Sequence, residues 1–187
     1  MLREDGYLFD DGTSWRLSET QFLMTTTTAN ASSVLSELER LLTLVWPNLK
    51  VHVSSVTDQW AGMAVAGPNS RDVLAKIIDD IDFSEKGLPQ MAVADGRISN
   101  IPVKVARLSF SGERAYEIYT GTSHGEAVWK AVIEAGKSYD IVPYGTEALG
   151  TLRIEKGHIS GPELDGRTTM NDLGLGKMAS ENKQYIG

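Results

Sequence analysis

The sequence predicts an α+β protein in which antiparallel strands pack against interspersed helices. Short alternating or β-branched segments come mostly in pairs separated by turn residues, as antiparallel hairpins require. Between these pairs lie segments whose apolar residues recur every three to four positions, the period of a helix with one buried face. Hydrophobic residues make up 41% and charged residues 23% of the 187 residues, which is typical of one ordinary globular domain or two small ones.

The N-terminal part is expected to contain short strands and one long helix. Turn dipeptides such as Asp11-Gly12 mark the strand ends, and threonines enrich the second hairpin strand. Asn30 is a plausible N-cap for the helix, and Pro47 stops it. The predicted elements are a strand at 7–9, a hairpin from 14–17 and 21–28, a helix at 29–45 and a strand at 50–56.

The middle of the chain repeats this alternation of strands and helices. A Gly67-Pro68 turn separates a strand from a helix, and a Ser99-Asn100 turn joins two further strands. Gly136 ends a later helix. The predicted elements are strands at 60–65, 91–98, 101–110 and 116–119, helices at 70–81, 122–136 and 146–155, and an extended piece at 141–143.

Three segments follow from this pattern. Residues 1–58 form a first sheet-plus-helix unit and residues 59–160 a second one, with a weak boundary within 57–67. Residues 161–187 are rich in glycine and polar residues and show little periodicity. Such a tail either wraps over another part of the protein or is disordered.

Composition excludes several classes of function. The formal net charge of -7, without a cluster of Lys and Arg, argues against nucleic acid as a partner. No apolar run is long enough for a membrane helix, and residues 1–5 are too polar for a signal peptide, so we expect a cytoplasmic protein. The chain has no cysteine, and its three histidines lack the spacing of metal ligands, so no metal site is expected.

Three acidic or basic positions could carry chemistry, and each also has a purely structural interpretation. Asp10 and Asp11 end a strand, so one carboxylate can turn inward and the other outward, or both belong to a polar turn. Glu117 lies within an apolar strand, where simple alternation would turn it to water. Arg153 shares a helix face with Lys156, as on any solvated, salt-bridged helix surface.

Taken in order, four segments resemble the glycine-cleavage T-protein (aminomethyltransferase) superfamily. One ends in a paired aspartate, one is similar to a QGP strand-to-helix turn, one to a YTGE-GYEI signature and one to an ARD-LRLE-G helix. These segments are 1–11 (MLREDGYLFDD), 64–70 (AVAGPNS), 110–118 (FSGERAYEI) and 145–157 (GTEALGTLRIEKG). The resemblance implies the α+β folate-binding fold of this superfamily, present here as an incomplete copy that a C-terminal barrel domain would follow.

Within the superfamily, the chain most resembles the branch formed by the α-subunits of heterotetrameric sarcosine oxidases. Segments with this character are 25–31 (TTTTANA), 56–61 (VTDQWA), 143–150 (PYGTEALG) and 161–169 (GPELDGRTT). Thr146-Glu147 stands where aminomethyltransferases carry an arginine-aspartate step, so their arginine contact to folate is missing. This departure favours the oxidase branch.

The resemblance also implies roles for residues and partners. Asp10 corresponds to the family's catalytic aspartate and Glu117 to its pterin-binding glutamate, which would require Glu117 to face the ligand. Thr27, Arg153 and Tyr116 are expected as further folate contacts, although alternation places Tyr116 on the strand face opposite Glu117. The implied cofactor is tetrahydrofolate; flavin and NAD are expected only in other parts of the complex, and the other sarcosine oxidase subunits are the expected partners.

The implied activity is part of sarcosine oxidation. Oxidation of sarcosine yields an imine, and tetrahydrofolate would trap its one-carbon unit as 5,10-methylenetetrahydrofolate. The alternatives are an aminomethyltransferase, a folate-dependent demethylase, or a non-catalytic folate-binding or assembly module. The presence of both Asp10 and Glu117 favours a catalytic function over the last of these.

Overall fold

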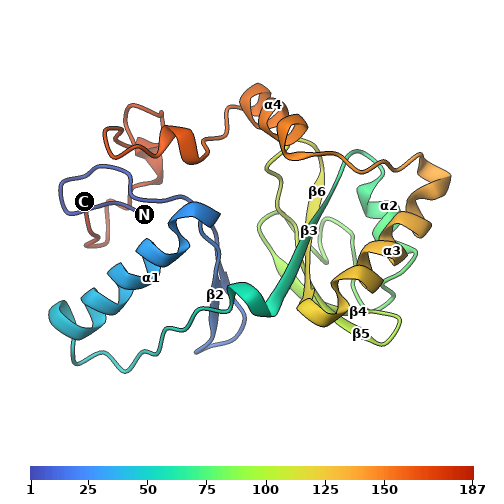
Figure 1. Ribbon diagram of the computed structural model, residues 1–187, viewed down its shortest axis with the longest axis horizontal. Helices are drawn as coiled ribbons and strands as arrows, with labels where there is room; N and C mark the ends of the chain where they lie inside the picture. Colours follow the sequence, from blue (N-terminus) through green and yellow to red (C-terminus); the bar gives the residue numbers. More distant parts are fainter. The chain divides into compact units, whose positions relative to one another are not determined.

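The computed structural model describes all residues, 1–187, and divides the chain into two compact units (Figure 1). The N-terminal unit combines Met1–Ser55 with Ile159–Gly187, and the central unit is Val56–His158. Both ends of the chain thus belong to the same unit, and the glycine-rich segment 161–187 is part of it rather than a separate extension. No helix of the molecule combines the length and the apolar character needed to cross a membrane.

The N-terminal unit contains the predicted hairpin and the predicted helix. Strands β1 (Ser14–Arg16) and β2 (Phe22–Met24) pair antiparallel, with Trp15 opposite Leu23. Helix α1 (Ala31–Arg40) continues into a π-helical turn at Leu41–Val45. The hairpin and the helix are therefore confirmed.

Two strands predicted for this unit do not form. Residues 51–56 have no regular secondary structure, although their apolar and polar residues alternate. They have no neighbouring strand to accept ladder hydrogen bonds, and Val51 is exposed, so alternation alone does not make a strand here. Residues 7–9 make only single bridges, from Leu8 to Leu2 and from Tyr7 to Thr169.

The C-terminal segment is held against the beginning of the chain by irregular contacts. The amide of Leu8 donates to the carbonyl of Thr168 at 2.9 Å, and Arg3 donates to the carbonyl of Gly166 at 3.4 Å. Two 3-10 turns, at Gly161–Glu163 and Gly176–Met178, are its only helical elements. Of the two expectations for this tail, the one in which it wraps over another part of the protein is confirmed.

The central unit is built on one four-stranded antiparallel sheet with strand order β3-β6-β5-β4. Each of the four predicted strands is confirmed, with ends shifted by a few residues, and Ser99 adopts a φ of 53° in the turn between β4 and β5. The strands are β3 (Trp60–Ala66), β4 (Val93–Ile98), β5 (Ile101–Ala106) and β6 (Ala115–Gly121).

Two helices cover one face of this sheet, α2 (Ser70–Ala75) and α3 (Gly125–Gly136) (Figure 1). The buried apolar side chains of the unit are shared between these helices, the sheet and the segment between α2 and β4. They are Val65, Leu74, Ile78, Ile81, Phe83, Leu88, Ile98, Val103, Val105, Tyr116, Ile118, Val128 and Val132.

The helix predicted at 70–81 is shorter than expected, because α2 ends at Ala75. Ile78 and Ile81 are nevertheless buried, held by turns instead of helix. Gly96 of β4 makes this possible, since a Cβ on it would lie 2.7 Å from Ile81. The apolar side chains at this spacing are thus buried although the segment that carries them is not helical. The last predicted helix is present as α4 (Thr146–Lys156).

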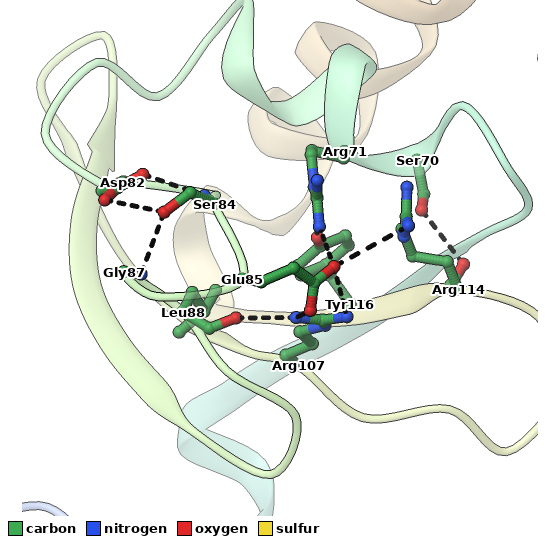
Figure 2. A network of polar contacts seen from close by, with 10 residues as sticks. All are labelled: Ser70, Arg71, Asp82, Ser84, Glu85, Gly87, Leu88, Arg107, Arg114 and Tyr116. Carbon is green, nitrogen blue, oxygen red and sulfur yellow. Dashed lines mark hydrogen bonds and ion pairs between the residues drawn. The ribbon is translucent and has the colours of Figure 1, made fainter.

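A network of charged side chains ties the segment between α2 and β4 to the sheet (Figure 2). Glu85 accepts from Arg71 at 2.5 Å and from Arg107 at 2.6 and 3.0 Å, and Arg114 lies 3.8 Å away. These hydrogen bonds from Arg107 and Arg71 lower the pKa of Glu85 to about 2. The network fixes the segment whose Phe83 packs edge-on against the ring of Tyr116, with centroids 5.5 Å apart.

The depressed pKa of Glu85 predicts a specific dependence of stability on pH. A carboxyl group ionises near pH 4.3 in an unfolded chain, so the network contributes fully above that pH and is lost as pH falls towards about 2. We therefore expect Glu85→Gln to lower Tm at pH 6, and the gap to the wild type to close between pH 4.5 and 2. Thermal melts at a series of pH values measure this gap.

Glu126→Gln is the matched control for this prediction. Glu126 forms an exposed helical ion pair with Lys130, a type of pair that contributes little to stability. Its substitution should change Tm only slightly at any pH. A Glu85→Gln gap that stayed constant down to pH 2 would contradict the role of the charge.

Candidate functional site

The carboxylate of Asp10 is buried and fixed within the N-terminal unit. Only 1% of the residue is exposed, whereas Asp11 is exposed, so the expectation that one carboxylate turns inward is confirmed. The amide of Thr27 donates to Oδ2 at 3.0 Å, and the side-chain amide of Asn30 donates to Oδ1 at 3.0 Å. Asp10 therefore holds the start of α1 to the strand-like segment that precedes β1.

The segment after Asp10 needs glycine at position 12, because it passes close to the backbone of Thr25. An added Cβ on Gly12 would lie 2.0 Å from the carbonyl oxygen of Thr25. The two segments are also joined at the next residue, because the amide of Thr13 donates to the hydroxyl of Thr25 at 3.0 Å. Residues 10–13 do not form a turn, so the polar-turn interpretation is not confirmed; the buried carboxylate is that of Asp10, and Asp11 is exposed.

Glu117 lies on the face of the β3-β6-β5-β4 sheet that α2 and α3 do not cover. Its neighbours Tyr116 and Ile118 are 0% exposed and belong to the core on the helix-covered face, so the alternation expected for this strand is confirmed. Glu117 does not reach free solvent, however; it is half-buried, and this burial raises the pKa of its carboxyl group. The chain thus keeps a partly dehydrated carboxyl group on an open sheet face.

Two tyrosines surround this carboxyl group. The hydroxyl of Tyr119 donates to Oε2 of Glu117 at 3.0 Å, which opposes the effect of burial on the pKa of Glu117. Burial and the charge of Glu117 together raise the pKa of Tyr144, which places this second phenol in the same electrostatic environment. No ion pair links Glu117 to a cation among the salt bridges of the molecule. An acceptor without a cationic partner is suited to a ligand that brings its own donors.

Small side chains leave space beside the carboxyl group. On β3, Ala64 is the register partner of Glu117 and Gly62 that of Tyr119. Both are exposed, and they flank the acidic group with the least possible side-chain bulk. This part of the uncovered face, formed by Glu117, Tyr119, Gly62 and Ala64, is called the shelf below.

Tyr116 does not belong to this shelf, which corrects the folate contact expected for it. The side chain is 0% exposed on the helix-covered face, its ring packs against Phe83, and Arg71 donates to its hydroxyl at 3.5 Å. Strand alternation, already visible in the sequence, is the physical reason.

The other two expected folate contacts belong to different units of the fold. Thr27 is in the N-terminal unit, where it is bound to Asp10 through its backbone. Arg153 is on α4 in the central unit, and its guanidinium donates to the carbonyl of His158 at 3.3 Å, closing the end of the helix. Asp10 and Thr27 are therefore brought together within one unit, while Glu117 and Arg153 belong to the other.

Three residues near the two carboxylates were missed or misassigned from the sequence. Asn30 was expected to cap α1 but makes no side-chain cap; its amide binds Asp10 instead. Tyr119 stands two positions after Glu117, a spacing that places both on one strand face and could have identified it. Tyr144 had no such signal, because it lies in an irregular segment.

A cavity of the central unit borders the shelf, since Gly62 and Ala64 are among its lining residues. It has a volume of about 770 Å³ and lies along β3, between α3 and the segment that leads into α4. Its lining is mainly apolar and includes Trp129 and Tyr144 but not Glu117. No group of three or more acidic or histidine side chains gathers to bind a metal anywhere in the molecule.

Comparison with known proteins gives one family model and several relatives. Residues 1–183 match the GCVT N-terminal domain. The chain is 47% identical to the sarcosine oxidase subunit alpha of Rhizobium meliloti. The alignment covers all of this chain and 19% of that protein. It is 32% identical to the aminomethyltransferase of Streptomyces coelicolor, over all of this chain and 49% of that protein. The chain thus spans about a fifth to a half of the length of these relatives.

Solved structures share the fold. The glycine cleavage system aminomethyltransferase T from Bartonella henselae aligns with a TM-score of 0.77 and 22% identity, over 97% of this chain and 46% of that one. A heterotetrameric sarcosine oxidase from Corynebacterium sp. U-96 aligns with a TM-score of 0.59 and 18% identity, over 75% of this chain and 66% of that one. The α+β fold expected for the aminomethyltransferase superfamily is thereby confirmed.

Proposed function

The chain belongs to the family of GCVT N-terminal domains, and from this premise we propose that it is a folate-binding region of a sarcosine oxidase α-subunit. Tetrahydrofolate would bind here and trap the one-carbon unit of sarcosine as 5,10-methylenetetrahydrofolate. The identity of 47% to one such subunit, against 32% to an aminomethyltransferase, supports the oxidase branch. The other subunits of the oxidase are the proposed partners, and flavin and NAD would act elsewhere in that complex.

The half-buried carboxyl group of Glu117 carries this proposal. A pterin presents an amino group beside a ring N–H, and a carboxylate can accept both hydrogen bonds at once. Glu117 has acceptor capacity to spare, because Tyr119 uses only one oxygen and no salt bridge includes this carboxylate. The small residues Gly62 and Ala64 beside it leave room for a flat ring.

Asp10 is the proposed catalytic residue. The nitrogens of folate attack an electrophilic carbon while protons leave, so a fixed carboxylate can stabilise the positive charge that develops there. Two N–H donors, one from Thr27 and one from Asn30, hold the carboxylate of Asp10 in one orientation. Such a preorganised group needs no reorientation during the reaction. Thr27 contributes by holding Asp10, and Arg153 is retained as a proposed folate contact.

Glu117→Gln tests the folate site directly. The amide keeps the shape and still accepts from the hydroxyl of Tyr119, but it replaces one acceptor by a donor that faces the donors of the pterin. We expect tetrahydrofolate binding to weaken at least about 10-fold to 100-fold, since hydrogen bonds to charged groups are worth about 1.5–3 kcal/mol. Isothermal titration calorimetry at neutral pH measures the change.

The same variant is expected to be more stable than the wild type at neutral pH. Burial raises the pKa of Glu117, so its ionised form opposes folding above that pKa, and the neutral amide avoids this penalty. A higher Tm together with weaker binding would separate loss of the ligand contact from loss of the fold. Unchanged affinity of Glu117→Gln for tetrahydrofolate would reject the proposed function.

A further inference from the structure

We infer that Tyr119 is a positioning residue that fixes the carboxylate of Glu117 for its ligand, and that Gly62 provides the space that Tyr119 needs. This inference rests on the proposed function, because it concerns the same carboxylate. It adds to that function a device formed by three residues on two adjacent strands. Its experiment distinguishes failure of the device from failure of the folate site.

The side chains of Tyr119 and Glu117 contact each other directly. Tyr119 and Glu117 are two residues apart on β6, so both point to the uncovered face of the sheet. The phenol donates to Oε2 at 3.0 Å. A carboxylate has about four lone-pair positions, so this bond leaves Oε1 and part of Oε2 free for the donors of a ligand.

The carboxylate of Glu117 needs such a contact to be held in one orientation. A glutamate side chain has three rotatable bonds, and its terminal torsion is only weakly restricted. Ordering a free glutamate costs conformational entropy. Two parallel hydrogen bonds to adjacent donors also require the carboxylate plane to match the plane of the ligand. A phenol that already holds one oxygen supplies part of this order before the ligand binds.

The ring of Tyr119 lies over Gly62. Gly62 on β3 is directly opposite Tyr119, and a Cβ on Gly62 would lie 3.1 Å from Cε1 of the ring. Its backbone does not require glycine, because it is ordinary strand without a positive φ. The absence of a side chain at position 62 is therefore explained by the ring above it.

Few charged groups surround the pair formed by Tyr119 and Glu117. On β5, Lys104 is the register partner of Tyr119 and forms an ion pair with Asp95 at 2.5 Å. Tyr144 is the other titratable group that interacts with Glu117. The alanines that flank Glu117 on both sides, Ala64 and Ala106, carry no charge. The phenol of Tyr119 is thus the group that counters the effect of burial on the carboxylate.

Tyr119→Phe tests the device, with one measurement that needs no ligand. NMR titration of the Glu117 side-chain carboxyl carbon should show a higher pKa in the variant, because the bond that lowers it is gone while burial remains. Tetrahydrofolate binding at neutral pH should weaken about 10-fold, the value of one hydrogen bond to a charged group. The acid limb of the binding profile should move to higher pH.

Two further variants complete the experiment. Gly62→Ala should displace the ring and shift both readouts in the same direction by a smaller amount. Tyr139→Phe is the matched control: it removes a phenol of the same unit whose ring lies 4.2 Å from the ammonium group of Lys76. It should change neither the titration of Glu117 nor the affinity for tetrahydrofolate.

The outcomes separate the two proposals. If Glu117→Gln weakens binding while Tyr119→Phe leaves both the affinity and the carboxyl titration unchanged, the positioning role is wrong and the folate site stands. If Glu117→Gln has no effect on binding, the folate site itself is wrong. A shifted titration in Tyr119→Phe with an unchanged affinity would also overturn the positioning role, because the contact would then have no effect on the ligand.

Discussion

Asp10→Asn is expected to lower the formation of 5,10-methylenetetrahydrofolate in the complete enzyme by at least about 100-fold, while sarcosine is oxidised at the wild-type rate. The magnitude is typical of removing one preorganised electrostatic contact from a reacting centre. The variant loses the negative charge that would stabilise the nitrogens of folate as they become positive. Product analysis with sarcosine and tetrahydrofolate, beside an assay of sarcosine consumption, measures both rates.

Asparagine is the appropriate replacement because the surroundings of Asp10 can adapt to an amide. The carbonyl oxygen of the new side chain can still accept from the amide of Thr27. Its NH₂ group can donate to Asn30 if that side chain turns its oxygen inward, since an amide can present either end. Asp10→Ala would instead leave two buried donors without acceptors, at a cost of about 1–3 kcal/mol each.

Asp11→Asn is the matched control. Asp11 is exposed and next to Asp10 in the chain, so its variant removes one charge from the same segment without touching the buried group. Its product yield should equal that of the wild type. A wild-type yield of methylenetetrahydrofolate from Asp10→Asn would remove Asp10 from the catalytic role.

The fold was predictable wherever a local pattern also found a partner. The strands of the central sheet alternate, and each has a neighbour that accepts its hydrogen bonds, so all four were predicted. Residues 50–56 alternate equally well, but no strand lies beside them. The helix expected at 70–81 shows the opposite case: turns can bury Ile78 and Ile81 as well as a helix can. Periodicity reports burial, and secondary structure needs hydrogen-bond partners in addition.

The candidate site was predictable to a smaller extent. The resemblance to known sequences, rather than the pattern of residues, singled out Asp10 and Glu117, because an acidic residue in a turn or a strand is most often a surface residue. Burial then distinguishes them, since 1% exposure for Asp10 and half-burial for Glu117 are unusual for carboxylates. Tyr144 could not be found from the sequence, because its position depends on an irregular segment that no period describes.

Tyr116→Ala is expected to destabilise the central unit by about 3–5 kcal/mol, as loss of a fully buried aromatic ring generally does. The residue is the largest of the fully buried side chains, and its ring contacts Phe83 edge-on. Chemical denaturation of the variant measures the loss. Tyr116→Phe keeps the ring and removes only a hydroxyl that Arg71 reaches at 3.5 Å, so it should cost no more than about 1 kcal/mol.

These two variants also decide between core and ligand as the function of this tyrosine. Tyr116 and Glu117 are adjacent in the chain but point to opposite faces of the sheet. Tyr116→Phe should therefore bind tetrahydrofolate as the wild type does, whereas Glu117→Gln should not. A folded Tyr116→Phe protein with weakened folate binding would show that the strand presents both side chains to the ligand, which its alternation does not allow.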